Sequence, residues 1–207
     1  MVDPAVSKDR ARNEFRRLRR ELPADAARAA GRSLAAQALA VVPGLIPAGA
    51  TVAAYLSAGR EPDTAPLLAG LHEHGYGVVV PVCEPDRRLS WCRWTPGVEL
   101  VPGLFPSVPE PAGPRLPVQD LPDLRLLLVP ALAVDRAGAR MGKGGGYYDR
   151  FLAGFRAAGG TAPAAGVVYD HEFVPAPSWA SGSLDQPMNA VLTPSQWTEL
   201  PERPVYS

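Results

Sequence analysis

The spacing of apolar residues predicts two helices near the N-terminus, followed by strands that alternate with helices. From Phe15 onward the apolar residues of the first segment recur at helical spacing, which predicts a helix over residues 5–21. The alanine-rich residues 24–41 predict a second helix, which Pro43 and Gly44 are expected to end.

The rest of the chain alternates between short apolar runs and longer amphipathic segments. Runs rich in β-branched residues are typical of buried strands, and apolar residues three or four apart are typical of helices. Strands are predicted at residues 51–56, 77–81, 89–95, 125–131, 164–169 and 189–193, and further helices at residues 65–74 and 147–158. This alternation predicts a Rossmann-like, three-layer α/β/α fold with a mainly parallel central sheet and flanking helices. In such folds the active site lies at the carboxyl ends of the strands.

Residues 96–123 do not fit this alternation. Seven prolines lie between Pro102 and Pro122, counting both ends. We expect a rigid, extended excursion over the sheet, with a disordered linker as the alternative. The chain as a whole, residues 1–207, is expected to be a single α/β domain in which residues 1–43 form the N-terminal helices.

The composition is that of a globular protein, because 46% of the residues are hydrophobic and 20% are charged. The formal net charge is zero, so no overall field attracts nucleic acid or anionic lipid. No secretory signal is recognisable, and no apolar run approaches the roughly 20 residues that cross a bilayer. We expect a cytoplasmic protein, a monomer, with neither a nucleic-acid nor a membrane partner.

The cysteines and histidines do not indicate a metal site. Cys83 and Cys92 form no CxxC pattern, so neither structural zinc nor a redox dithiol is indicated, and both are expected to be small buried hydrophobes. His72, His74 and His171 have no ligand partners in the sequence and are expected at the surface.

The clearest candidate chemistry lies in residues 140–149, Arg-Met-Gly-Lys-Gly-Gly-Gly-Tyr-Tyr-Asp. Four glycines let backbone N–H groups approach an anion, and the predicted helix that follows adds its positive N-terminal end. Arg140 and Lys143 add full charges. The spacing excludes a Walker A loop, because Ala137 stands where that motif requires glycine. It also excludes a dinucleotide-binding GxGxxG loop, because Tyr147 stands where the third glycine of that motif belongs. We therefore predict a phosphate-binding loop, with a flexible surface turn as the alternative.

Residues 138–150 resemble the signature of the 5-formyltetrahydrofolate cyclo-ligase (methenyltetrahydrofolate synthetase) family, roughly G-x-R-L-G-x-G-x-G-Y-Y-D. Similar segments extend the resemblance over nearly the whole chain: Lys8 with Arg12, residues 55–64, 104–111, 167–170 and 185–193. The chain departs from the family at Leu184, where histidine is common, and at Glu172, where glutamine is frequent. Met141 replaces a usual leucine of similar volume.

The resemblance implies an ATP- and Mg²⁺-dependent ligase that converts 5-formyltetrahydrofolate to 5,10-methenyltetrahydrofolate, with release of ADP and phosphate. Phosphoryl transfer needs mainly positioning and neutralisation of phosphate charge. The implied catalytic residues are Arg140, Lys143 and Tyr148. The implied nucleotide-binding residues are Lys8, Arg12, Arg140, Met141, Gly142, Lys143, Gly144, Gly145, Gly146, Tyr147 and Tyr148.

The same resemblance implies metal and folate contacts. Asp149 and Asp185 would bind magnesium, since hard oxygen donors suit that ion. Glu61 would bind the polar edge of the folate. The folate pocket would be lined by Leu56 and Tyr148, and less securely by Trp94.

Simpler interpretations of these residues stay open on the sequence alone. Lys8 and Arg12 fit a solvated helix face, Asp149 fits an acid favoured by the helix dipole, and Asp185 fits a turn before Pro187. Two other functions also stay open. One is a related α/β enzyme that acts on another phosphorylated small molecule, and the other is a non-catalytic relative that binds nucleotide or RNA through its arginine-rich first helix.

Overall fold

Helices and strands alternate through the middle of the chain, as the sequence predicted. The computed structural model describes residues 4–180 and 182–201, with side chains from residue 8 onward. The helices are α1 (Pro4–Glu21), α2 (Ala24–Leu45), α3 (Ala65–Glu73) and α4 (Tyr147–Ala157), with short 3-10 turns η1 (Pro85–Arg87), η2 (Val118–Asp120) and η3 (Asp170–Glu172).

A seven-stranded sheet in the order β12-β11-β9-β6-β1-β2-β3 forms the centre. Its strands are β1 (Thr51–Ala53), β2 (Gly77–Glu84), β3 (Arg88–Trp94), β6 (Leu124–Pro130), β9 (Ala164–Val167), β11 (Ala190–Leu192) and β12 (Trp197–Glu199). The five inner strands run parallel, whereas β3 and β12 pair antiparallel at the two edges. The prediction of a mainly parallel sheet is confirmed.

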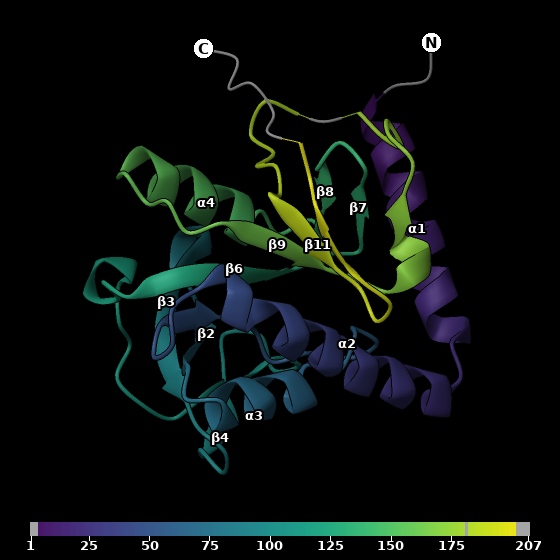
Figure 1. Ribbon diagram of the computed structural model, residues 1–207. Helices are drawn as coiled ribbons and strands as arrows, with labels where there is room; N and C mark the ends of the chain where they lie inside the picture. Colours follow the sequence, from purple (N-terminus) through teal and green to yellow (C-terminus); the bar gives the residue numbers. More distant parts are fainter. Residues whose placement is uncertain (1–3, 181, 202–207) are drawn as a thin grey trace.

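Helices cover both faces of the sheet. Figure 1 shows α2 and α3 below the sheet and α4 above it, which confirms the three-layer arrangement. The connection from β1 through α3 leads to β2 on one side, and the connection from β6 through α4 leads to β9 on the other. The chain therefore diverges between β1 and β6, the switch point at which open α/β sheets bind their ligands.

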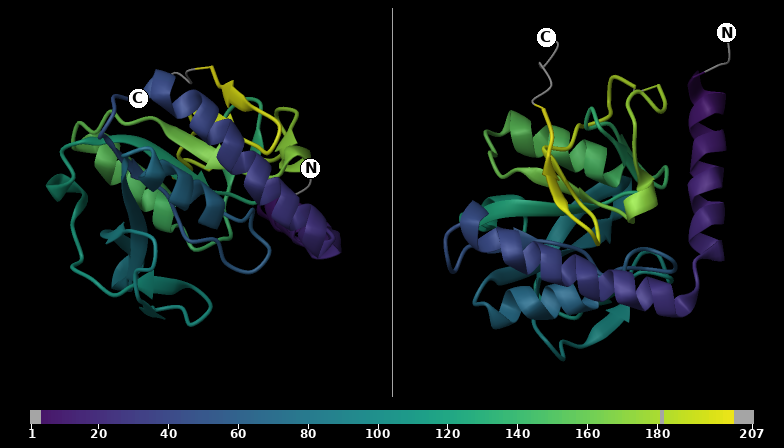
Figure 2. Two further views of the ribbon diagram at one scale, coloured as in Figure 1. Left: turned by 60° about the horizontal axis from the view of Figure 1, so that its bottom comes forward. Right: turned by 45° about the vertical axis from the view of Figure 1, so that its right-hand side comes forward.

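Helix α1 stands beside these layers rather than within them. Figure 2 shows it nearly upright at one end of the molecule, across the direction of α2. Its Phe15 packs with Leu132, Met141 and Trp179 in a small hydrophobic cluster of its own. This packing holds α1 against a hairpin formed by β7 (Ala133–Asp135) and β8 (Arg140–Met141), to which β10 (Phe173–Val174) adds a parallel strand.

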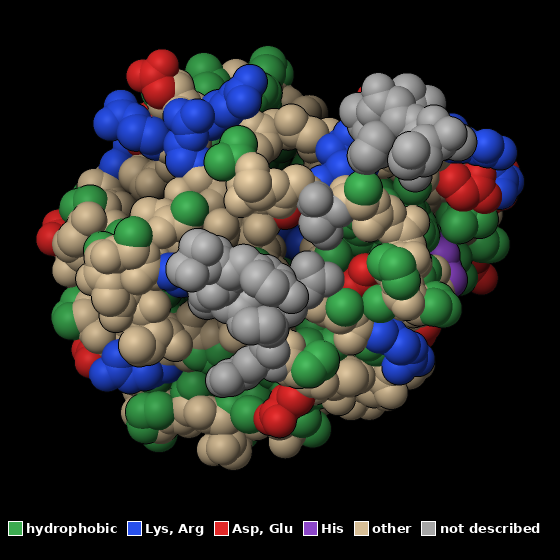
Figure 3. Space-filling model, turned by 90° about the horizontal axis from the view of Figure 1, so that it is seen from above, with side chains coloured by type: hydrophobic (Ala, Val, Ile, Leu, Met, Phe, Trp, Pro, Cys, Tyr) green, Lys and Arg blue, Asp and Glu red, His purple; other side chains and the backbone are tan. Residues whose placement is uncertain are grey.

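Charges of both signs lie on the surface. On the face seen from above, basic and acidic side chains are scattered among other groups and neither sign covers it (Figure 3). None of the described helices is both long enough and apolar enough to cross a bilayer.

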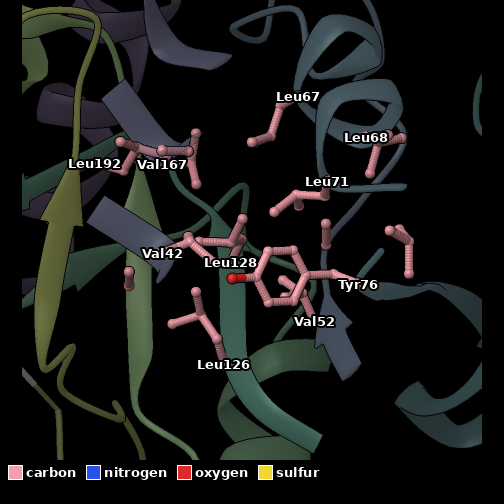
Figure 4. Close-up of a cluster of buried hydrophobic side chains, with 14 of the residues drawn as sticks. Val42, Val52, Leu67, Leu68, Leu71, Tyr76, Leu126, Leu128, Val167 and Leu192 are labelled. Atoms are coloured by element: carbon pink, nitrogen blue, oxygen red, sulfur yellow. The ribbon is translucent and has the colours of Figure 1, made fainter. Parts of the chain in front are cut away.

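The alternation of side chains along the strands divides the core into two parts. Val52, Leu126 and Leu128 point to the face covered by α2 and α3, where they meet Val42 and Leu71 (Figure 4). Their neighbours along the strands, including Leu127 and Val129, point to the face covered by α4. Strands buried on both sides are typical of parallel sheets and explain the continuous apolar runs in the sequence.

Two predicted boundaries are wrong. Helix α2 continues through Pro43 to Leu45, because buried Val42 and Ile46 hold its last turn in the core and the Ile46 amide still bonds to the Val42 carbonyl. Strand β1 ends at Ala53 rather than at residue 56.

A hairpin that the sequence analysis did not predict separates the strand at residues 124–130 from the glycine loop (residues 142–146). Strands β7 and β8 are three and two residues long, too short to leave a periodic signal. The glycine loop therefore starts from a hairpin and not from the central sheet.

The proline-rich segment does not run extended over the sheet as predicted, because it folds back on itself and meets the edge of the sheet. Its strands β4 (Leu100–Pro102) and β5 (Pro109–Pro111) form a small hairpin. Further on, Leu116 and Trp91 of β3 exchange two backbone hydrogen bonds at 2.7 and 2.8 Å, and Leu121 packs into the core on the α4 side. The segment thus covers the outer side of β3 around Trp91.

Candidate active site

A cavity of about 840 Å³ opens at the carboxyl ends of β1, β2 and β6. It is lined there by Tyr55 after β1, by Pro81 and Cys83 of β2, and by Pro130 and Ala131 at the end of β6. Its volume lies in the upper part of the range of about 300–1,000 Å³ for small-molecule sites. The position at the switch point is the one that the fold class predicts.

Nearly all the site residues inferred from the sequence meet in this cavity. They come from α1, the segment after β1, the glycine loop, the start of α4 and the segment before β11. The cavity lining includes Lys8, Arg12, Leu56, Glu61, Arg140, Gly142, Lys143, Gly144, Gly145, Gly146, Tyr147, Tyr148, Asp149 and Asp185.

Two candidates do not reach the cavity. Met141 is fully buried beside Phe15 and Trp179, because its position in β8 turns its side chain into the cluster under α1. Trp94 pairs with Val78 at the amino end of β2, whereas the cavity lies at the carboxyl end. Its ring makes an edge contact with His72. The expected roles of Met141 in nucleotide binding and of Trp94 in the folate pocket are therefore wrong for their side chains.

The glycine loop needs glycine at specific places. At Gly142, an added Cβ would lie 2.9 Å from Nη1 of Arg140, so the absence of a side chain lets the arginine pass. Gly146 has φ of 71° and precedes α4 in the left-handed conformation, with no side chain capping the helix. The first amides of α4 are therefore available to an anion.

Each of three cations in the cavity contacts one acid, and the family resemblance assigned these acids to magnesium or to the folate rather than to the cations. Lys8 Nζ lies 2.5 Å from Asp185 Oδ2, Arg140 Nη2 lies 2.7 Å from Asp149 Oδ1, and Lys143 Nζ lies 2.7 Å from Glu61 Oε1. The protein thus neutralises its own phosphate-binding charges. A bound phosphate must share or replace these carboxylates.

Side chains of helix α1 hold the glycine loop by hydrogen bonds to the backbone carbonyls of the loop. Arg12 Nε donates to the Gly142 carbonyl at 3.3 Å, and Arg16 Nη2 donates to the Lys143 carbonyl at 3.0 Å. Arg12 also pairs with Asp9 on the same helix. Arg12 and Arg16 are thus occupied with the loop, and Arg12 also with a neighbouring acid.

The segment after β1 is held by its own polar side chains. Thr64, which is fully buried, donates from Oγ1 to the Tyr55 carbonyl at 2.6 Å and accepts from the Ser57 amide at 3.1 Å. The Ala58 amide donates to Glu61 Oε2 at 2.8 Å. These bonds fix the Glu61 carboxylate at the cavity wall.

Two buried tyrosine hydroxyls in the cavity wall have no hydrogen-bond partner among the described residues, those of Tyr55 and Tyr148. Burial raises the pKa of both phenols, and the nearby Glu61 carboxylate raises each further. Both hydroxyls therefore stay protonated and are able to donate. Buried polar groups are normally satisfied, so these two indicate a ligand or water that supplies the acceptor.

Sequence reasoning missed several residues of the cavity. Tyr55 was read as the interior of a strand, and Cys83 as a buried hydrophobe, although it is half-buried and lines the cavity. Phe105 comes from the proline-rich segment and meets the ring of Tyr147 edge-on, with centroids 5.8 Å apart. No local pattern marks these positions, because they reach the cavity only through the tertiary fold.

The two departures from the family pattern have different positions. Leu184 lines the mouth of the cavity and is 79% exposed. Glu172 is fully buried and pairs with Arg19, away from the cavity lining.

The acids in the cavity are compatible with magnesium. Among the described residues no group of three His, Cys, Asp or Glu side chains forms a metal site. Magnesium, however, needs only one or two carboxylates, with phosphates and waters completing its shell. Asp149 accepts from Arg140 and from the Gln186 amide through Oδ1, so Oδ2 accepts no hydrogen bond from the described part of the chain. That amide also brings the segment of Asp185 beside Asp149.

Comparison with known proteins agrees with this geometry. The model of the 5-formyltetrahydrofolate cyclo-ligase family matches residues 4–194. The chain belongs to this family. As a member of the cyclo-ligase family it is an enzyme of the ligase class.

Individual relatives cover most of the chain. A 5-formyltetrahydrofolate cyclo-ligase of Mycolicibacterium smegmatis is 40% identical over 158 residues, which cover 74% of this chain and 78% of the relative. The cyclo-ligase of Escherichia coli K12 is 36% identical over 154 residues, which cover 70% and 79%.

Solved structures show the cyclo-ligase fold. The 5,10-methenyltetrahydrofolate synthetase of Aquifex aeolicus has a TM-score of 0.71 at 24% identity and covers 97% of this chain and 96% of its own. That of Mycoplasma pneumoniae has a TM-score of 0.69 at 15% identity, with coverage of 90% and 98%. At these identities the likeness establishes the architecture alone.

Proposed function

We propose that the protein catalyses the ATP- and Mg²⁺-dependent closure of 5-formyltetrahydrofolate to 5,10-methenyltetrahydrofolate, with release of ADP and phosphate. The observation that carries the proposal is that a single cavity joins an anion site to a buried wall of aromatic and polar groups. A nucleotide and a reduced folate need these two kinds of surface side by side.

The glycine loop would hold the phosphates. Backbone amides of residues 142–146 and the start of α4 suit anions, and Lys143 and Arg140 add charge. Lys8 and Arg12 approach the same loop from α1. Four cations around one loop suit the charge that phosphoryl transfer spreads over the phosphate oxygens.

The opposite wall would hold the folate. Leu56 supplies apolar surface, and Glu61 presents a carboxylate that suits the N–H donors of a pterin ring. The unpartnered hydroxyls of Tyr55 and Tyr148 suit the carbonyl oxygen of the pterin ring and the oxygen of the formyl group.

Asp149 and Asp185 would hold the magnesium ion, which when bound supplies charge neutralisation to the phosphates. Arg140 and the Gln186 amide orient the Asp149 carboxylate, and Lys8 and the Gly182 amide orient that of Asp185. These donors keep the carboxylates in place while they face a ligand.

The reaction needs positioning more than proton transfer. The formyl oxygen attacks the γ-phosphorus and ADP leaves. The N10 amine then attacks the formyl carbon, and phosphate leaves with the formyl oxygen as the N10 proton is lost. Arg140 and Lys143 would stabilise the transferring phosphoryl group, and Tyr148 would orient the formyl group.

An absorbance assay for methenyl-folate tests the proposal. Turnover is expected only when ATP, Mg²⁺ and 5-formyltetrahydrofolate are all present. A correctly folded protein that forms no product with all three would refute it.

Replacement of Lys143 by alanine tests the phosphate site more directly than replacement of Arg140 does. The Lys143 side chain is 52% exposed, so its loss should leave the melting temperature within about 2 °C while the KM for ATP rises about 10-fold or more. Arg140 is 5% exposed and also bonds to the Pro130 carbonyl, so its replacement mixes binding with stability. Unchanged ATP affinity in Lys143→Ala would remove this lysine from the phosphate site.

A further inference from the structure

A buried ion pair outside the cavity connects α1 to η3. Arg19 Nε donates to Glu172 Oε1 at 2.6 Å, and Arg19 Nη2 donates to Oε2 at 2.9 Å. Arg19 is 3% exposed and Glu172 is fully buried. Figures 1 and 2 show the segment around η3 lying beside α1.

The pair is also linked by hydrogen bonds to the main chain on both sides of the cavity. Arg19 Nη2 donates to the carbonyl of Ala131, a cavity residue at the end of β6, at 2.5 Å. Glu172 Oε2 accepts from the Tyr169 amide at 2.9 Å, and the Tyr169 hydroxyl donates to the Glu61 carbonyl at 3.2 Å. A continuous chain of hydrogen bonds therefore runs from α1 to the backbone of Glu61.

Stability alone does not explain this pair. Burial is the largest influence on Arg19 and works against its charge, but the hydrogen bonds to Glu172 together with the nearby negative charges of Glu172 and Glu61 outweigh it and raise the pKa of Arg19. Apolar side chains of similar volume often stabilise a protein as well as a buried ion pair does. The pair fixes the orientation of the Arg19 side chain, and with it that of α1, because a guanidinium bonded to two carboxylate oxygens and a carbonyl has one orientation.

That orientation matters at the other end of α1. Lys8 lies eleven residues before Arg19, about 16 Å along the helix at 1.5 Å per residue. A tilt of about 5° at Arg19 would displace Lys8 by roughly 1.4 Å, and misplacement of about 1 Å can reduce a rate about 100-fold. Arg12 and Arg16, which hold the glycine loop, lie between the two.

We propose that Arg19 and Glu172 are positioning residues that fix α1, and with it the phosphate-binding cations, relative to Glu61 across the cavity. This inference rests on the proposed function. It assigns no contact with substrate to either residue.

Paired variants separate positioning from stability. Arg19→Met leaves a buried carboxylate unpaired and should lower the melting temperature, whereas Arg19→Met with Glu172→Met should restore much of it. If the pair positions α1, both variants should bind ATP about 10-fold or more weakly by calorimetry, and the double variant should keep a raised KM for ATP at restored stability. Recovery of wild-type ATP affinity together with stability would overturn the proposal.

Two further variants complete the experiment. Glu172→Gln keeps the shape and one acceptor oxygen, so its ATP affinity should lie between those of the wild type and the double variant. Wild-type ATP affinity in both Glu172→Gln and the double variant would also overturn the proposal. Arg17→Met is the matched control, because Arg17 pairs with Glu14 and Glu21 on the exposed side of the same helix and should leave ATP affinity unchanged. Wild-type protein that binds ATP but makes no methenyl-folate would refute the proposed function and leave the positioning test intact.

Discussion

At the scale of single residues, two tyrosines and a cysteine of the cavity wall favour hydrogen-bond donation over proton transfer. Burial raises the pKa of Tyr55 and Tyr148, and burial together with Glu110 and Glu84 raises the pKa of Cys83 to about 11. All three groups are neutral near pH 7 and none is poised as a general base there. This agrees with a reaction driven by positioning of phosphate and formyl groups.

The pKa of Cys83 leads to a labelling prediction. Because burial disfavours the thiolate, and a pKa of about 11 lies two units above the ordinary value of 9.0, the thiolate fraction at pH 8 should be about 100-fold below that of an exposed cysteine. In a Cys92→Ala background, the alkylation rate should rise about tenfold per pH unit from pH 7 to 10 without levelling. A plateau near pH 8 to 9 would show that the thiol is not shielded.

At the scale of elements, close packing between α2 and the segment before α3 depends on one glycine. A Cβ added at Gly31 would lie 2.8 Å from Cβ and 2.9 Å from the carbonyl oxygen of Asp63. The side chain of Asp63 accepts from the Ala65 amide at the start of α3. The helix thus approaches this backbone closely because position 31 has no side chain.

Gly31→Ala should therefore destabilise the protein, although alanine favours helix. We expect a loss of about 1–3 kcal/mol, because the clash is with the Cβ and the carbonyl oxygen of Asp63, which cannot move without the main chain. Gly154→Ala in α4 is the matched control: it has no atom within 4 Å of an added Cβ and should gain about 0.5–1 kcal/mol. Urea unfolding of both variants measures the difference, and a gain in both would contradict the packing.

Local patterns predicted long elements well and short ones poorly. Strand β6 and helix α4 were placed within a residue or two, because their apolar spacing is strong. The hairpin of β7 and β8 was missed, and the end of α2 was decided by the burial of Val42 and Ile46 rather than by Pro43. Tertiary packing overrode the local signal in α2, whereas β7 and β8 are too short to leave one.

At the scale of the whole molecule, the cavity brings together segments that are far apart in the sequence. The glycine loop was recognisable from the spacing of its glycines, whereas Lys8, Glu61 and Asp185 were found through family resemblance. Which cation pairs with which acid was not predictable, since the partners of Lys8 and Lys143 lie 177 and 82 positions away. Contacts at such separations are set by the topology of the sheet.

The pair of Lys143 and Glu61 predicts that the two substrates bind cooperatively. Nucleotide phosphates that attract Lys143 would release the Glu61 carboxylate to the folate, so a non-hydrolysable ATP analogue should tighten 5-formyltetrahydrofolate binding by about 5-fold or more. Lys143→Ala should abolish this coupling, and calorimetric titrations with and without the analogue measure it. Equal folate affinity in both titrations of the wild type would show that the pair does not couple the ligands.

The bridge between Leu116 and Trp91 has a consequence for self-association. Strand β3 ends the sheet on one side, and a bare sheet edge is a template on which other chains add and aggregate. The segment that covers this edge carries a proline every few residues, and proline offers no amide to an incoming strand. The proline-rich stretch therefore hinders strand addition next to the valine-rich sheet behind it, and loss of the Leu116–Trp91 bridge would favour aggregation.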